Sequence, residues 1–325
     1  MPRVTDDPPA AVRSDLEALG DALDEAIPPR VLDRNLLIAT WNLRAFGGLT
    51  EKWVASGDES PKRDLQSIRA IAEIIRRFDV VALQEVRGNL KALRHTLEVL
   101  GSDWDLILTD VTQGAPGNDE RLGFLFDRRR VRVSGLAAEL VVPREELDDV
   151  APDALRRQFA RTPYAVSFRC GDETFILVTL HVLYGDSASE RTPELRAIAN
   201  WLDRWARDVN SWDHNLIALG DFNIDRMGDE RYEAFTSTGI EVPEDLHRVP
   251  RTLFSDPTEP NAGKFYDQIA WFTEDAGRPA LSLVHRESGY FDFRDVALPR
   301  RGLTDFQLSW RISDHYPLWT EFDLG

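Results

Sequence analysis

Apolar and polar positions follow two different periods along this chain. Where apolar side chains recur every three or four positions, the pattern predicts amphipathic helices. The first such segment is Ala11–Ile27, and the two prolines that follow it end the helix. Further helices are expected to start at Ser60-Pro61, to span about Leu90–Leu100, and to carry the periodic residues of Leu195–Val209.

Short continuous apolar runs predict strands that are buried on both faces. The expected strands are Leu36–Trp41, Asp79–Gln84, Asp105–Thr109, Leu122–Asp127, the hairpin pair Tyr164–Phe168 and Thr174–Leu180, then Leu216–Gly220, Tyr266–Phe272 and Tyr316–Phe322. Strands and helices mix throughout, and no repeat or linker divides them. The pattern therefore favours an α/β fold of two packed sheets with helices outside. We expect one domain over residues 34–325, preceded over residues 1–33 by a tail, disordered up to residue 10, and an accessory helix.

Two segments have no clear periodicity. Arg128–Arg132 carries four arginines and is interpreted as a solvated turn between strands, with a phosphate contact as the alternative. Glu139–Phe159 is acidic and irregular, which is typical of a lid or a surface excursion.

The stretch LIALGDFN, Leu216–Asn223, combines a buried strand with polar chemistry. The strand ends on Gly220, where the backbone can bend sharply or approach a neighbour closely. Asp221 and Asn223 are two positions apart and point the same way, so a carboxylate and an amide oxygen lie side by side. Such a pair suits a hard divalent cation. The alternative is an ordinary turn, because Asp and Asn side chains readily bond nearby backbone.

Polar residues terminate or flank most of the expected strands. They are Asn42, Glu85, His181, Asp221, Asn223, Asp314 and His315. Strand ends in layered α/β folds converge on one crevice. Carboxylates with amide oxygens favour Mg²⁺ or Mn²⁺ over zinc, and two histidines can serve as general base and general acid. This set is the apparatus for hydrolysing a phosphate ester by in-line attack of water. Taken singly, each residue also fits a surface, core or turn position.

Composition narrows the class of protein. With 325 residues, 42% of them apolar, the chain can form a large globular core, and its net charge of −17 excludes a large basic nucleic-acid surface. A nuclease that holds phosphate through a metal and a few arginines remains compatible with that charge. The sole cysteine, Cys170, permits no internal disulfide. Without an apolar secretory signal or membrane-spanning run, we expect a cytoplasmic monomer with no membrane contact.

Several motifs in order resemble those of the endonuclease/exonuclease/phosphatase superfamily. They are Trp41-Asn42, Gln84-Glu85, His181, GDFN at 220–223 and SDH at 313–315. Within the superfamily, segments such as WNLRAFGG, FYDQIAWF and ISDHYPLW resemble the deoxyribonuclease I group. The resemblance covers about Leu36 to Phe322. It implies a four-layered α/β sandwich, deoxyribonuclease I-like, with the site at one end of both sheets.

The resemblance also implies roles for individual residues. Mg²⁺, or Mn²⁺ in its place, would lie near Glu85. Close to the metal or the scissile phosphate would lie Asn42, Asp221, Asn223 and Asp314. His181 would pair with Glu120 and His315 with Asp267, each carboxylate fixing its imidazole. Arginines at positions that contact DNA in that group are Arg44, Arg87 and Arg161.

The expected function is a metal-dependent DNA endonuclease, but the chain departs from the group in one loop. Asn118 and Asp119 stand before Glu120, where the group has an aromatic residue and a lysine. This change should weaken duplex binding. The alternative is therefore a phosphoesterase acting on a small phosphoester, a nucleotide or a lipid head group. A non-enzymatic binding module would have lost a catalytic residue, and none is lost here.

Overall fold

The computed structural model describes residues 1–112, 118–140, 161–182, 184, 188–208, 215–255, 264–273 and 281–324, without the side chains of residues 188–190. Most of the expected lid, Glu139–Phe159, and the last periodic residue of the long helix, Val209, lie outside these ranges.

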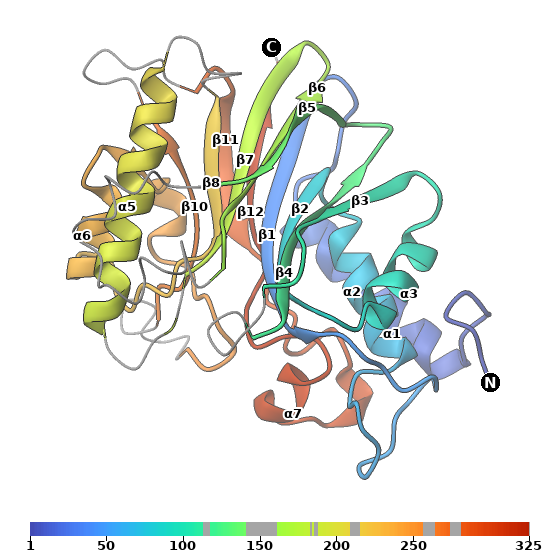
Figure 1. Ribbon diagram of the computed structural model, residues 1–325. Coiled ribbons are helices and arrows are strands. Elements are labelled where there is room, and N and C mark those ends of the chain that lie inside the picture. The colour runs from blue at the N-terminus through green and yellow to red at the C-terminus, as the bar shows by residue number, and fades with distance from the viewer. Residues whose placement is uncertain are drawn as a thin grey trace.

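Two mixed six-stranded sheets form the centre of the molecule (Figure 1). Across the first sheet lie β11 (Val284–Tyr290), β12 (Leu318–Asp323), β1 (Asn35–Phe46), β2 (Val80–Arg87), β4 (Glu120–Asp127) and β3 (Trp104–Leu108). Across the second sheet lie β5 (Arg132–Glu139), β6 (Tyr164–Cys170), β7 (Glu173–His181), β8 (Leu216–Asp221), β10 (Asp267–Phe272) and β9 (Ile240–Glu241). β1 is parallel to β2 and β7 is parallel to β8, whereas the other paired strands are antiparallel.

Helices cover the outer face of each sheet, as Figure 1 shows. On the first sheet these are α1 (Ala10–Ala26), α2 (Leu65–Ile75) and α3 (Lys91–Leu100), and on the second α5 (Ala188–Arg207) and α6 (Glu230–Thr236). A short helix, α7 (Asp305–Ser309), and two 3₁₀ turns, Glu244–Leu246 and Pro299–Arg301, complete the described elements. The helix–sheet–sheet–helix arrangement confirms the predicted four-layered sandwich.

The alternation of side chains along β1 separates two hydrophobic cores. Leu36 and Ile38 belong to the core between the sheets, whereas Leu37 and Ala39 belong to the core under α1–α3. All four are fully buried. Burying one such aliphatic side chain contributes about 1.5–3 kcal/mol, so both faces of this strand stabilise the fold.

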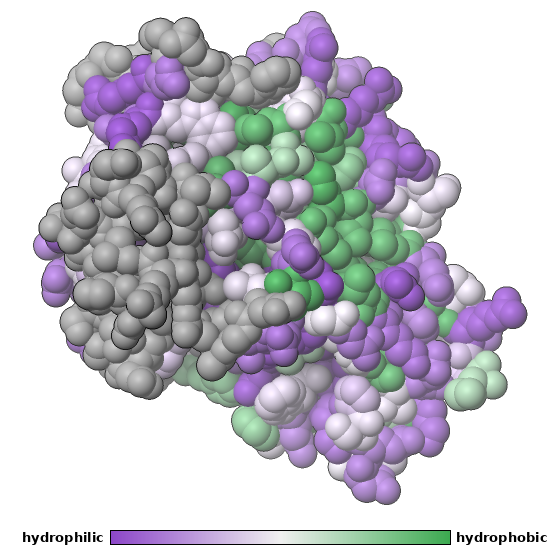
Figure 2. Space-filling model, viewed as in Figure 1, coloured by the Kyte–Doolittle hydropathy of each residue, from purple (hydrophilic) through white to green (hydrophobic). Residues whose placement is uncertain are grey.

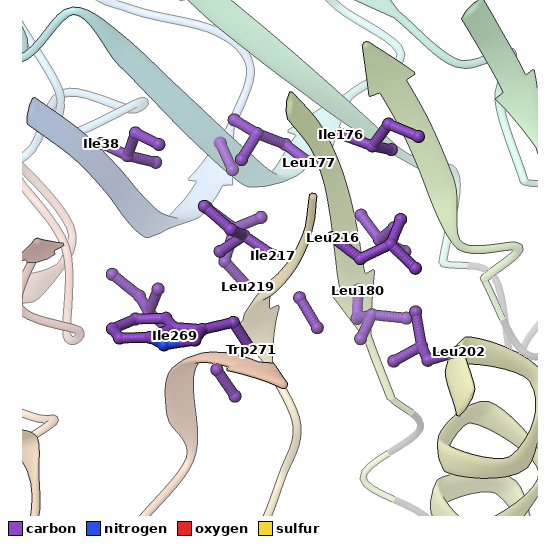
Figure 3. Packing of buried hydrophobic residues seen from close by; sticks show 14 of the residues in the cluster. Ile38, Ile176, Leu177, Leu180, Leu202, Leu216, Ile217, Leu219, Ile269 and Trp271 are labelled. Atoms are coloured by element: carbon purple, nitrogen blue, oxygen red, sulfur yellow. The ribbon is translucent and has the colours of Figure 1, made fainter. Parts of the chain in front are cut away.

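The same alternation appears in the second sheet. In Figure 3, Ile217, Leu219 and Ile38 point into the space between the sheets, while Leu216 points toward Leu202 of α5. The continuous apolar run around Leu216 is therefore buried on both faces, as its sequence predicts.

Figure 2 shows hydrophobic residues gathered in a band over β3 and β5. On β5, the side chain of Val133 is 40% exposed. None of the helices in the described ranges is both long enough and apolar enough to cross a membrane.

Several expected boundaries were wrong. α2 begins at Leu65 and not at Ser60-Pro61, because the Asp64 side chain caps it by accepting a hydrogen bond from Ser67 N. β1 continues past Trp41, and Phe46 pairs with Val86 beyond an irregularity in the ladder. β5, β9, β11, α6 and α7 were not expected. β11 is an edge strand in which no residue is fully buried, so it lacks an apolar signal.

The N-terminal tail is ordered rather than disordered. Val4 is only 1% exposed and belongs to the core under α1–α3. Arg69 of α2 donates a hydrogen bond from Nε to Val4 O at 2.7 Å. Gln66 of the same helix donates from Nε2 to Asp15 Oδ2 in α1 at 2.9 Å. These contacts attach the tail and the first helix to the main body.

Two arginines, Arg130 from the turn between β4 and β5 and Arg30 from the segment before β1, hold buried carboxylates at one end of the sheets. Arg130 Nε lies 2.9 Å from Asp79 Oδ1, and Arg30 Nη1 lies 3.0 Å from Asp127 Oδ2. Both carboxylates are fully buried. We call Arg30, Asp79, Asp127 and Arg130 the far-end ion cluster. It gives the arginine-rich turn a structural role, and the interpretation as a solvated turn was incomplete.

Candidate active site

Strand ends bring the predicted polar residues to the end of the sheets opposite the far-end ion cluster, the lower end in Figure 1. His181 ends β7 beside Asp221 at the end of β8, and Asp267 at the start of β10 pairs with the same Asp221. Glu120 starts β4 beside Arg87 at the end of β2. Parallel strands that end here and antiparallel strands that begin here place their polar termini on one edge.

His181 faces two carboxylates. Its Nδ1 lies 3.3 Å from Glu120 Oε2, and its Nε2 lies 3.6 Å from Asp221 Oδ2. Glu120 is almost fully buried, with Arg161 Nε at 2.6 Å and Arg87 Nη2 at 3.2 Å. Burial alone would raise the pKa of Glu120, but the contacts with His181, Arg161 and Arg87 outweigh it and lower that pKa. Glu120 is therefore an ionised partner for the imidazole.

His315 forms the second imidazole–carboxylate pair. Its Nδ1 lies 2.6 Å from Asp267 Oδ2. Burial raises the pKa of Asp267 to about 6. Burial alone would lower the pKa of His315, but the negative charge of Asp267 and the hydrogen bond raise it well above its ordinary value of 6.5. The ring of Tyr266 stacks on the His315 imidazole at 5.9 Å.

Asp221 connects these groups to two amides. Its Oδ2 accepts a hydrogen bond from Asn42 Nδ2 at 3.0 Å, and its Oδ1 accepts one from Asn223 N at 2.9 Å. The second bond is the local turn that was the alternative interpretation of this stretch, so the turn and the site coexist. Asn223 Nδ2 donates to Val182 O at 2.6 Å.

Gly220 allows two strands to meet at the site. Its φ is 139°, and a Cβ placed on it would lie 2.1 Å from Leu180 O. No side chain fits there, which confirms the close approach predicted for this glycine. The approach brings the ends of β7 and β8, and therefore His181 and Asp221, into contact.

Glu85 lies on an irregular segment of β2. Its φ is 59°, in the left-handed region that costs a non-glycine residue about 1–3 kcal/mol. Its Oε2 accepts a hydrogen bond from Ala45 N at 2.8 Å, and Ala45 itself has a φ of 45°. The neighbouring site residues Asn118, Asp119 and Asn223 also have positive φ. Backbone strain of this kind concentrates at functional sites.

Arg44 and Asp314 lie together at the rim. Arg44 Nη1 is 3.5 Å from Asp314 Oδ2. The Ser313 hydroxyl accepts from Arg44 N at 3.2 Å and donates to Asn42 O at 2.5 Å, so the SDH segment is joined to the end of β1. The predicted residues thus form linked contacts at one end of the two sheets.

The donor chemistry fits a hard divalent cation. Asn42 Oδ1 and Asp314 Oδ1 are buried side-chain oxygens with no hydrogen-bond partner, which is costly unless a ligand satisfies them. Glu85 adds a partly exposed carboxylate on the same rim. Oxygen-only donors suit such cations. Within the described ranges, no group of three or more His, Cys, Asp or Glu side chains is arranged to hold a metal.

Sequence reasoning missed three arginines that hold the site. Arg63 is buried and donates to the carbonyls of Arg44 at 2.8 Å and Ile312 at 3.1 Å, joining β1 to the SDH segment. Burial lowers its pKa to about 10 although Glu85 and Asp314 oppose this, so both carboxylates lie within its electrostatic reach. Arg251 and Arg191 donate to the carbonyls of Asp267 and Asn223. Bonds to distant backbone carbonyls leave no pattern in the sequence.

Comparison with known proteins identifies the family of this chain. The model of the Endonuclease/Exonuclease/phosphatase family matches residues 39–315. A deoxyribonuclease of Thioalkalivibrio sp. is 30% identical over 196 residues, which cover 58% of this chain and 46% of that protein, less than half its length. Deoxyribonuclease-1 of Bos taurus is 26% identical over 298 residues, covering 88% of this chain and 92% of that enzyme.

A solved structure is similar over most of its length. It is a mannosyl-6-phosphatase of Bacteroides thetaiotaomicron, with a TM-score of 0.56, 16% identity, and coverage of 88% of this chain and 99% of that one. At this identity the similarity supports the fold alone. The matched family model, the fold and the order of motifs lead to one conclusion: this chain belongs to the Endonuclease/Exonuclease/phosphatase family.

Proposed function

We propose that this protein is a divalent-metal-dependent phosphodiesterase that acts on DNA as an endonuclease. One observation carries the proposal: two imidazoles, each facing a buried carboxylate through Nδ1, lie around Asp221. The negative charge of Asp221 also contributes to the raised pKa of His315. A phosphate bound beside Asp221 would therefore have an imidazole on either side. Similarity to two deoxyribonucleases favours DNA as the substrate.

The two carboxylates fix which nitrogen of each imidazole is available. Glu120 and Asp267 each face an Nδ1 atom, which favours the tautomer with the proton on that atom. Nε2 is then the atom that exchanges a proton with substrate or water. Asp267 further stabilises the protonated form of His315, as a buried acid does for a catalytic histidine.

The reaction needs one proton acceptor and one proton donor. Water attacks phosphorus in line, one imidazole takes its proton, the P–O ester bond breaks, and the other imidazole protonates the leaving oxygen. We leave the two roles unassigned between His181 and His315. Asn223 and Asn42 both bond Asp221, so they would lie beside the bound phosphate and bond its non-bridging oxygens. A divalent cation held by Glu85, Asn42 and Asp314 would supply electrostatic stabilisation of the charge on those oxygens.

Three arginines complete the proposed substrate contacts. Arg87 and Arg161 both face Glu120, at 3.2 Å and 2.6 Å, and Arg44 lies beside Asp314. They provide local positive charge in a protein whose net charge is −17. Phosphate contacts of this kind position a nucleic acid without reading its sequence.

A small phosphoester is the second candidate substrate, and the loop before Glu120 favours it. Asn118 donates from Nδ2 to Glu120 Oε1 at 2.7 Å, so this side chain turns into the site. Asp119 adds a negative charge next to it. Neither group would attract a second phosphate strand.

A substrate panel tests the assignment. Purified protein is incubated with plasmid, single-stranded DNA, RNA and small phosphoesters, with Mg²⁺ and then with chelator, and His181→Ala serves as the control. We expect chelator-sensitive cleavage of DNA that the variant loses. Hydrolysis of small esters with intact plasmid and oligonucleotides would overturn the nuclease assignment. Absence of activity on every ester would favour a binding module.

A further inference from the structure

Two exposed aromatic side chains beside Arg44 have no part in the proposed mechanism. Phe306 of α7 and the neighbouring Trp310 are 60% and 40% exposed. Their rings meet edge to face, with centroids 6.5 Å apart. The guanidinium of Arg44 lies 4.0 Å from the centroid of the Trp310 ring and 5.9 Å from that of Phe306. We call Arg44, Phe306 and Trp310 the aromatic shelf.

Arg44 fixes the shelf to the proposed active site. Its Nη1 donates to Ser309 Oγ at 2.6 Å and lies 3.5 Å from Asp314 Oδ2. Its carbonyl accepts a bond from the buried Arg63. Figure 1 shows α7 below the sheets, at the end where the site residues lie. A group that stacks on the shelf would therefore lie next to Asp314, one of the proposed ligands of the cation that binds the scissile phosphate.

α7 holds the two aromatic side chains in a defined position. Thr304 and Gln307 form a capping box at its start, and Leu308 and Ser309 are buried beneath it. Exposed aromatic side chains at the rim of a site are a common feature of ligand-binding surfaces. Here the helix is anchored by residues other than Phe306 and Trp310, so the two rings are not needed to fold it.

The side chains around the shelf favour an unpaired nucleobase over a base pair in a duplex as its ligand. The two described residues before Glu120, Asn118 and Asp119, present an amide and a carboxylate, and neither can stack on a planar ring as an aromatic side chain does. A base inside a duplex has both faces covered by its neighbours, whereas an unpaired base has a face free to stack on an aromatic ring. The net charge of −17 further disfavours the dense phosphates of a duplex.

We propose that the aromatic shelf binds an unpaired nucleobase next to the scissile phosphate, which makes single-stranded nucleic acid the preferred substrate. This inference rests on the proposed nuclease function and specifies its substrate. Stacking on an aromatic ring tolerates every base, so the shelf selects for an unpaired strand and not for a sequence.

The test compares two substrates that differ only in their bases. One is a single-stranded oligonucleotide, and the other is the same backbone with abasic residues. Trp310→Ala is expected to raise KM for the first about tenfold, the size of one lost base–aromatic stack, and to leave KM for the second unchanged. Trp310→Phe should restore most of the affinity because it keeps a ring.

A matched control removes an exposed apolar side chain at the other end of the molecule. Val284 is 62% exposed and pairs with Asp323 at the far end of β12. Val284→Ala should match the wild type on both substrates. If Trp310→Ala changes KM equally for both substrates, or for neither, the proposal that the shelf binds a nucleobase is overturned.

Fluorescence anisotropy tests base binding by the shelf separately from the proposed nuclease activity. Labelled single strand and abasic strand are titrated with protein in chelator, so that hydrolysis does not interfere. If the wild type cleaves no nucleic acid, the proposed function fails. The shelf is then supported if the wild type binds the base-bearing strand more tightly than Trp310→Ala does, and overturned if the two bind it equally.

Discussion

Both ends of the sheets bury carboxylates, but they treat them differently. At the far end, Asp79 and Asp127 are each paired with arginine, and Asp79 Oδ2 also accepts a bond from Leu37 N. At the site end, Asp267 Oδ1 and Asp314 Oδ1 are buried without a hydrogen-bond partner. Unsatisfied buried polar atoms destabilise a folded chain. The far end is therefore built for stability, and the site end retains bonding capacity for a ligand.

The backbone follows the same division. Of the six non-glycine residues with positive φ, Ala45, Glu85, Asn118, Asp119 and Asn223 lie at the site end and only Asp33 lies elsewhere, in the described part of the chain. Each such position costs about 1–3 kcal/mol. The paired far end and the two hydrophobic cores offset this cost, which allows the strained segments to persist.

Substitution of either histidine at the site end should have the largest effect, and that effect should be on activity. We expect His181→Ala and His315→Ala each to lower kcat about 10²–10⁴-fold, because each removes one proton-transfer group. Folding of His181→Ala should persist, since Glu120 keeps Arg161 and Arg87 when His181 is lost. Steady-state hydrolysis and thermal unfolding measure the two effects. Full activity in either variant would contradict the assignment.

Substitution of a buried carboxylate at the far end should lower the stability of the fold and leave activity unchanged. Asp79→Asn breaks a buried ion pair and leaves Arg130 uncompensated, so we expect the free energy of unfolding to fall by about 3–5 kcal/mol. Activity of the folded fraction should match the wild type, because the residue lies at the opposite end from the site. Chemical denaturation and kcat measured below the melting temperature check both. A large loss of kcat without loss of stability would contradict the claim that the far end serves stability and the site end serves activity.

The protonation of His315 tests how a buried carboxylate at the site end acts on its neighbour. The pKa of His315 is raised above 6.5 in the folded chain, so its pairing stabilises the protein below pH 6.5 and is lost as pH rises through the folded pKa. Asp267→Asn removes the charge responsible while burial remains, so the pKa of His315 should fall. NMR titration of the imidazole measures it. An unchanged pKa would show that Asp267 does not control this histidine.

Site residues could be predicted from the sequence where their neighbours along the chain form a recognisable pattern. GDFN was found because polar residues directly follow a buried strand, and SDH because polar residues stand just before one. Glu120 and Asp267 followed only from family resemblance, since each lies at the beginning of a strand and resembles an ordinary surface acid. The exposed position of Phe306 and Trp310 depends on the fold and could not be read from spacing.

The central claim is that unpartnered oxygens at the site end hold a divalent cation for phosphodiester hydrolysis. The most direct test is the Mg²⁺ dependence of single-stranded DNA cleavage by the wild type and by Glu85→Gln. We predict that the wild type is inactive in chelator and recovers as Mg²⁺ is added, and that the variant needs at least about tenfold more Mg²⁺ for half-maximal rate. Cleavage independent of Mg²⁺, or the same curve for both proteins, would contradict the account.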